Sequence, residues 1–186
     1  MVPLTSLWLP ILLSAVIVFV ASSLIHMLLG YHKNDYLRLP KEDDVMTALR
    51  AFNIPPGDYG MPKPGSMKDI RSPEFEAKQK KGPVAWLTVL PSGDMNMGAR
   101  MGMWFLYSVV ISFFAAYVGS RAVGPAADYL MVFRFVGTTA FMGYAMSLPQ
   151  QSIWYSRNWG TTLRLMFDGL LFACLTAGTF GWLWPR

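Results

Sequence analysis

Apolar residues in this chain gather into four long runs that are separated by polar stretches. The runs cover approximately residues 7–30, 101–119, 129–148 and 165–184. The first two contain no charged residue, whereas Arg134 interrupts the third and Asp168 the fourth. A bilayer core of about 30 Å needs roughly 20 apolar residues in a helix, so each run is long enough to cross a membrane. The pattern predicts an all-α integral membrane protein, a four-transmembrane-helix bundle.

The residues that flank these runs predict an orientation, because Lys and Arg accumulate on the cytoplasmic side of a membrane. No Lys or Arg precedes the first run, which also argues for a retained helix over a cleaved signal peptide. Lys33 and Arg38 follow the first run, Arg100 precedes the second, and the loop after the second contains only Arg121. We therefore expect both termini outside and the polar insert 31–100 in the cytoplasm.

The polar insert between the first and second runs holds twenty of the 27 charged residues. Within it, residues 40–53 have the spacing of a short amphipathic helix. Four residues form the apolar face of this helix, which is a candidate docking surface for a partner or a membrane-lying face: Val45, Ala48, Leu49 and Phe52.

The rest of the insert has two parts with different compositions. Residues 54–83 are rich in Pro, Gly, Lys and Ser, which predicts an extended and weakly structured segment. Residues 84–90 are apolar but too few to span a bilayer. They fit a strand, an interfacial helix or a plug beneath the bundle. Interfacial contact is favoured, because Trp86 and the nearby lysines suit the headgroup layer.

Composition excludes several classes of protein. The chain has 186 residues, 53% hydrophobic and only 15% charged, against about 25% charged in ordinary soluble domains. Its net charge of +5 does not indicate nucleic-acid binding, because acidic residues interleave with the basic ones of the insert. One cysteine, Cys174, cannot form a disulfide within the chain. No phosphate-binding loop or catalytic motif is present, which favours a protein that is not an enzyme, and no cofactor is predicted. A membrane enzyme that acts on a lipid or a quinone is left as a further alternative.

Small residues at a spacing of four mark the last span. Such stripes let helix backbones approach closely in lipid. The stripe packs either within this chain or against another protein, and its members are Gly169, Ala173, Ala177 and Gly181.

Ionisable residues inside the spans need a reason, since a charge in a bilayer core is costly. Asp168 lies one helical turn after Arg164, which predicts a local ion pair. Two alternatives remain open: a proton or cation site with Asp168 facing a cavity, and a tie to Arg134 on the third span. Arg134 lies near the opposite border, where we expect its side chain to extend outward to the headgroups.

No metal site is predicted, although a few residues are weak candidates. His26 and His32 would point about 120° apart if the first helix continued through Gly30. Met97 and Met101 share a helix face, and thioethers suit Cu(I), yet packing by these adaptable side chains is the favoured explanation. As acid–base groups, only His26, Asp35 and Asp168 qualify, and no spacing makes them converge.

The sequence thus predicts a small, non-catalytic, multi-pass membrane protein that serves as an accessory or assembly subunit of a larger membrane complex. Its expected partners are the lipid bilayer and either another membrane protein or further copies of itself. The alternative is a small oligomeric ion or solute transporter or channel that uses Asp168.

Overall fold

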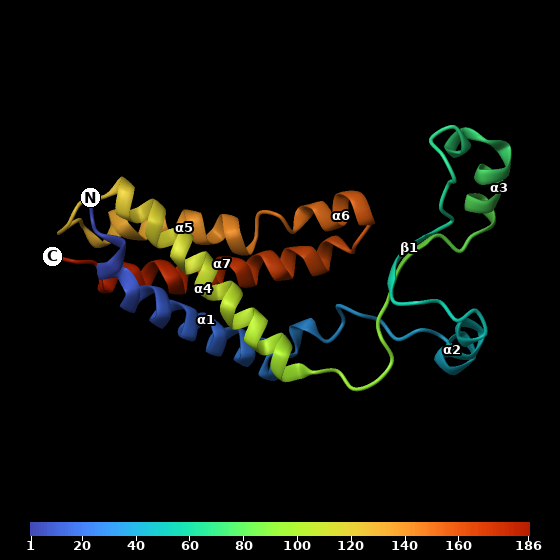
Figure 1. Ribbon diagram of the computed structural model, residues 1–186, viewed down its shortest axis with the longest axis horizontal. Coiled ribbons are helices and arrows are strands. Elements are labelled where there is room, and N and C mark those ends of the chain that lie inside the picture. Colours follow the sequence, from blue (N-terminus) through green and yellow to red (C-terminus); the bar gives the residue numbers. More distant parts are fainter. The chain divides into compact units, whose positions relative to one another are not determined.

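The computed structural model describes all 186 residues, which divide into two compact units. The first, the helical unit, comprises Met1–Tyr36 and Asn96–Arg186 (Figure 1). The second, the insert unit, comprises Leu37–Met95. The insert as a folded body is therefore somewhat shorter than the polar stretch 31–100, because residues at both of its ends belong with the helices.

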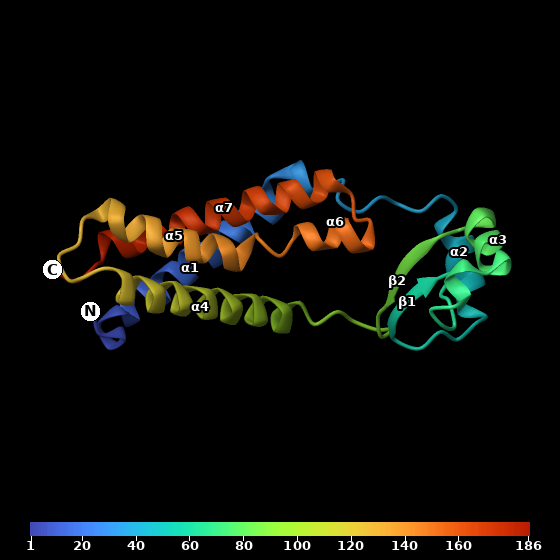
Figure 2. The same ribbon diagram turned by 90° about the horizontal axis from the view of Figure 1, so that it is seen from above.

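Four helices pack side by side in the helical unit. They are α1 (Trp8–Leu28), α4 (Met97–Ala122), α5 (Tyr129–Tyr144) and α7 (Trp159–Trp182). Both α1 and α5 contact α4 and α7, so the four helices close into a ring (Figures 1 and 2). A short 3₁₀ helix, η1 (Leu4–Leu7), leads into α1. The C-terminal end of the chain contacts the α4–α5 turn, where Ala126 N donates to Pro185 O at 2.9 Å and Trp184 Nε1 donates to Gly124 O at 2.9 Å.

Three of the four helices are long and apolar enough to cross a membrane: Leu4–Leu28, Met97–Ala122 and Trp159–Trp182. The expected count of four is therefore wrong. Helix α5 has 16 residues, and at 1.5 Å per residue it rises only about 24 Å. The reason is Pro149, whose ring would clash with the carbonyl of Ala145 in a continuous helix. The helix ends at Tyr144, and a second short helix, α6 (Pro149–Tyr155), begins at the proline.

Helices α5 and α6, with the non-helical segment between them, run antiparallel along α7 (Figure 2). At one end, a Cβ added to Gly181 would lie 2.6 Å from the ring of Tyr129. Midway, a Cβ added to Gly169 would lie 2.9 Å from that of Ala145. At the other end, the hydroxyls of Ser152 and Thr162 are 2.7 Å apart. The broken stretch thus covers most of the length of α7.

Small polar side chains join α1 to α4 inside the ring. Ser14 Oγ donates to Ser112 Oγ at 3.0 Å, and Trp104 Nε1 donates to Ser22 Oγ at 2.8 Å. All three serines are buried. In an apolar environment each such hydroxyl needs a partner, so these bonds also fix the register of the two helices.

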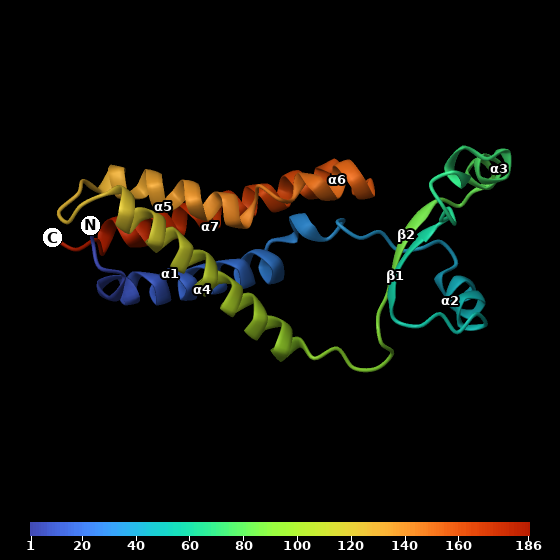
Figure 3. The same ribbon diagram turned by 45° about the horizontal axis from the view of Figure 1, so that its top comes forward.

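The insert unit contains two short helices and a two-stranded sheet. These are α2 (Glu42–Arg50), β1 (Gly57–Met61), α3 (Pro73–Lys81) and β2 (Ala85–Val89), with a 3₁₀ turn η3 at Asp69–Arg71. The strands pair antiparallel, with Tyr59 opposite Leu87 (Figure 3). Only one large apolar side chain of this unit, Phe75, is buried.

One expectation for the insert differs from the structure, because residues 54–83 contain β1, η3 and α3, where composition predicts little structure. Residues 84–90 contain strand β2, one of the three forms that fitted their composition, and their contact with the membrane interface stays a prediction. The signals for α3 are present in the sequence. Ser72 accepts from Phe75 N as an N-cap, Pro73 occupies the first helical position, and Gly82 follows the end. The abundance of Pro and Gly is misleading, because these residues here mark element boundaries.

Candidate functional site

A cluster of ionisable side chains lies where the chain leaves α1 and crosses the first turns of α7. We call it the polar cluster, and its members are Tyr31, His32, Asp35, Arg164 and Asp168. It forms because α1 ends at Leu28. Leu29 takes an extended conformation (φ −89°, ψ 110°), and the 3₁₀ turn η2 (Gly30–His32) follows. This change of direction carries three side chains of the connector onto α7.

Asp35 contacts one side chain of α7 and one side chain of the connector. Arg164 Nε donates to Asp35 Oδ1 at 2.9 Å, and His32 Nδ1 lies 2.7 Å from Asp35 Oδ2. Both carboxylate oxygens are therefore engaged. The side chain of Asp35 is buried, so the pairing with Arg164 supplies the charge compensation that a buried carboxylate requires.

Asp168 is the most buried ionisable residue of the polar cluster, with 1% of its surface exposed. The Tyr31 hydroxyl donates to its Oδ1, and His32 Nε2 lies 2.8 Å from its Oδ2. This second contact does not have the geometry of a hydrogen bond, and neither atom hydrogen-bonds any other protein atom. Asp168 Oδ2 and His32 Nε2 are thus close together but not joined by a hydrogen bond.

Burial and neighbouring charges shift two pKa values in the connector. Burial of the phenol, together with its hydrogen bond to Asp168 and the negative charges of Asp168 and Asp35, raises the pKa of Tyr31 to about 12. For Asp35, burial acts to raise the pKa, but hydrogen bonds from His32 and Arg164 outweigh it, so the pKa lies below its ordinary value. Near neutral pH, Tyr31 is a donor and Asp35 is an anion.

His26, in the last turn of α1, stacks on His32. The ring centroids are 4.5 Å apart and the planes differ by 4°. His26 Nδ1 lies 3.0 Å from Ser22 O. The expected divergence of the two imidazoles is wrong, because the helix does not continue through Gly30. Potential ligand atoms of His26, His32 and Asp168 all lie within 4.8 Å of one another.

The predicted ion pair between Arg164 and Asp168 is not formed, because Arg164 turns to Asp35. Nor does Arg134 reach Asp168. Arg134 is exposed on α5 and makes no ion pair. The sequence patterns also failed to indicate that His26, Asp35 and Asp168 converge through His32. The available signals were Gly30, which permits the helix to end, and the spacing of three between His32 and Asp35.

The other predicted residues are distributed over both units. The stripe of small residues on α7 is mostly buried against α5, as the close approaches at Gly169 and Gly181 show. Met97 and Met101 are exposed on the first turns of α4. The predicted helix 40–53 is shorter in the structure, where α2 covers Glu42–Arg50, so Phe52 lies in the turn after it. Val45 is half-buried, whereas the other members of the predicted docking face are exposed: Ala48, Leu49 and Phe52.

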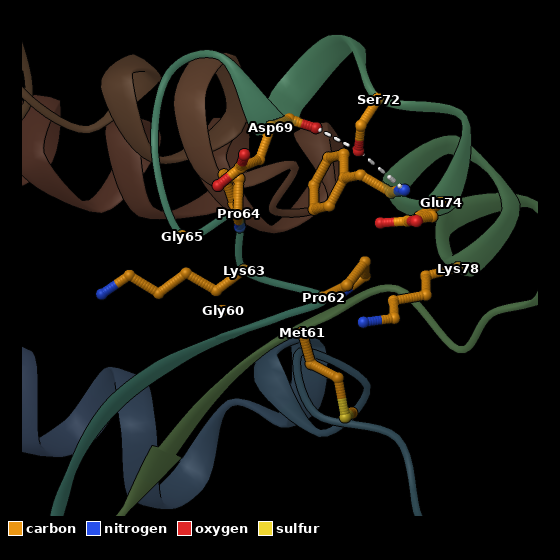
Figure 4. A pocket seen from close by; sticks show the side chains of 11 residues that line it. Gly60, Met61, Pro62, Lys63, Pro64, Gly65, Asp69, Ser72, Glu74 and Lys78 are labelled. Atoms are coloured by element: carbon orange, nitrogen blue, oxygen red, sulfur yellow. Dashed lines mark hydrogen bonds between the residues drawn. The ribbon is translucent and has the colours of Figure 1, made fainter.

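A cavity of about 510 Å³ opens in the insert unit between β1 and α3 (Figure 4). Its charged lining residues are Lys63, Asp69, Glu74 and Lys78, which include both signs. Ser72 at its rim is occupied as the N-cap of α3. No histidine or cysteine lines the cavity.

The chain matches no known family model, and comparison with curated proteins and with solved structures also gave no match.

Proposed function

We propose that the protein is a small, non-catalytic accessory or assembly subunit of a larger membrane complex, held in the bilayer by its helical unit. The observation that carries the proposal is the exposed apolar face of α2 in the insert unit. Leu49, in the last turn of α2, is 39% exposed, and Phe52, in the turn that follows the helix, is 73% exposed. Such a face buries its apolar surface when it docks into the groove of a partner.

The occupant that we propose for this face is a different membrane protein. The insert unit is covalently tied to the helical unit at both of its ends, so a partner held in the same membrane meets its surface at a raised effective concentration. Acidic Glu42, Asp43 and Asp44 occupy the first turn of α2, at the edge of the apolar face. A complementary groove is therefore apolar at its centre with basic residues at one rim.

The orientation is part of the proposal. The broken stretch of α5 and α6 covers most of α7, and together the two helices are long enough to return the chain across the bilayer. Both termini then lie outside and the insert unit lies in the cytoplasm, as the distribution of Lys and Arg indicates. Maleimide labelling of intact cells tests this, with Cys174→Ser as the background and the single-cysteine variants Thr5→Cys and Ser92→Cys. We expect labelling of the first variant only, and labelling of the second contradicts the orientation.

Co-purification tests the accessory role. The protein is extracted from native membranes in mild detergent, and proteins that accompany it in fixed ratio are identified. Phe52→Glu places a charge in the proposed contact, so we expect at least a tenfold loss of the partner. Met67→Glu is the matched control, since Met67 is an exposed apolar residue elsewhere in the insert unit. A homogeneous homo-oligomer, or equal recovery with both variants, contradicts the proposal.

One observation favours transport as a second candidate function. Asp168 is almost fully buried, and the next residue, Gly169, packs on the helix break at Ala145. Broken helices beside a buried ionisable residue are a feature of ion-binding sites in transporters. Ion flux into liposomes that falls with Asp168→Asn, with unchanged folding, is the expected result. Flux indistinguishable from that of empty liposomes removes this candidate.

A further inference from the structure

We propose that His26, His32 and Asp168 form a binding site for a divalent transition-metal ion of the Zn²⁺ type, at the junction of α1 and α7. The proposal does not depend on the accessory role. It starts from a juxtaposition of three side chains that come from α1, the connector and α7, with potential ligand atoms all within 4.8 Å of one another. Two imidazoles and one carboxylate are a ligand set that Zn²⁺ and similar ions accept.

The tautomers of both histidines leave Nε2 available. His26 Nδ1 faces the carbonyl oxygen of Ser22 at 3.0 Å, and His32 Nδ1 faces Asp35 Oδ2 at 2.7 Å. A carbonyl and a carboxylate only accept hydrogen bonds, so each Nδ1 carries the proton. In a neutral ring, Nε2 then offers a lone pair. Hydrogen bonds of this kind from the second ring nitrogen orient metal-binding histidines and raise their basicity.

The contact between His32 and Asp168 requires a cation. With Nδ1 protonated, His32 Nε2 is an acceptor, and it lies 2.8 Å from Asp168 Oδ2, which is also an acceptor. Both atoms are buried and lack a hydrogen bond to any other protein atom. Asp35 and Asp168 together carry one more negative charge than Arg164 neutralises. A proton on His32 Nε2 or on Asp168 Oδ2, or a metal ion between them, removes this repulsion.

His26 distinguishes the metal from the proton. A protonated His32 already has a carboxylate at each ring nitrogen, so its pairing does not require a second imidazole. A metal ion does, because a Zn²⁺ site with three protein ligands and a water is a common arrangement. Ligand atoms around a tetrahedral Zn²⁺ are about 3.3 Å apart, given metal–ligand distances near 2.0 Å. His26 therefore has to leave the parallel stack and turn toward the other two, and its exposure leaves room for that movement.

The composition of the chain makes the test unambiguous. His26 and His32 are its two histidines, and Cys174 is its one cysteine. The full-length protein is prepared without a histidine tag, in detergent, with Cys174→Ser as the background. Zn²⁺ binding is measured by equilibrium dialysis, and ¹⁵N spectra of labelled histidine report the protonation state of each ring nitrogen.

We expect one Zn²⁺ per chain and a shift of both Nε2 resonances, with both Nδ1 atoms still protonated. His26→Gln and Asp168→Asn should each weaken binding by more than the roughly 10–100-fold that the loss of an outer hydrogen-bond partner costs. Asp94→Asn, an exposed carboxylate in the insert unit, is the matched control and should bind as the parent does.

His26→Gln is the decisive variant, because His26 is exposed and its replacement leaves the pairs of Asp35 untouched. Its folding is checked by the thermal unfolding midpoint without metal. Absence of Zn²⁺ binding by the parent overturns the proposal. Equal affinity of the parent and His26→Gln also overturns it. A doubly protonated His32 whose resonances do not respond to Zn²⁺ assigns the cation to a proton instead.

Discussion

Arg164 on α7 donates to Asp35 at 2.9 Å, although Asp168 lies only one turn away on the same helix. The arginine thus pairs with a residue 129 positions earlier in the chain. This frees Asp168 to meet Tyr31 and His32, and it ties the connector after α1 to the start of α7. The members of the polar cluster are therefore linked, because the partner of each charged side chain determines which partners remain for the others.

Removing the guanidinium should destabilise the helical unit. Arg164→Gln leaves Asp35 buried with His32 as its remaining partner, and loss of a hydrogen bond to a charged group costs about 2 kcal/mol. We expect a lower thermal unfolding midpoint in detergent, and circular dichroism is the measurement that monitors it. Arg134→Gln is the matched control, because Arg134 is exposed and makes no ion pair. An equal midpoint for Arg164→Gln and the parent would contradict a structural role for this pair.

The close approach at Gly169 should not tolerate a methyl group. An added Cβ would lie 2.9 Å from Ala145 Cβ and 3.3 Å from the backbone carbon of Tyr144, and neither neighbour has a flexible end that moves aside. We expect Gly169→Ala to cost about 1–3 kcal/mol through overpacking.

Gly102 provides the comparison for this substitution. It lies in α4 with nothing within 4 Å of an added Cβ, so Gly102→Ala should be neutral or slightly stabilising through helix propensity. The two unfolding midpoints are measured side by side. If the unfolding midpoint of Gly169→Ala is no lower than that of Gly102→Ala, α7 does not pack closely against the break after α5.

Phe75 should contribute to the stability of the insert unit but not to that of the helical unit. It is the one large apolar side chain buried there, so Phe75→Ala should cost the unit about 3 kcal/mol. Hydrogen exchange followed by mass spectrometry should then show faster exchange in β1, α3 and β2. The helices of the other unit should keep their protection, because the two units have separate interiors. Faster exchange throughout the chain would show that the units unfold together.

The N-cap of α3 gives a smaller and more local effect. Ser72 Oγ accepts from Phe75 N at 3.2 Å, and replacement of an N-cap serine by alanine costs about 1 kcal/mol. Ser72→Ala should accelerate exchange in the first turn of α3, whereas Ser66→Ala, at an exposed serine outside the helix, should not. Equal exchange in the two variants would show that this cap contributes nothing to α3.

The sequence by itself determined that the chain is mostly helical and where its three long apolar helices lie. Hydropathy is a local property, so a run such as 101–119 indicates a membrane-length helix wherever it lies in space. The amphipathic helix around Leu49 was predictable for the same reason. The break before Pro149 was predictable in principle, but the apolar composition of 129–148 concealed it.

Only the tertiary structure decided which ionisable residues meet. Spacing along one helix favoured Asp168 as the partner of Arg164, because residues four apart are neighbours in any helix. The actual partners, Asp35 for Arg164 and His32 for Asp168, come from a connector whose direction is set where α1 ends at Leu28. A pairing across more than a hundred residues depends on how the ring of helices closes, and no local pattern encodes that closure.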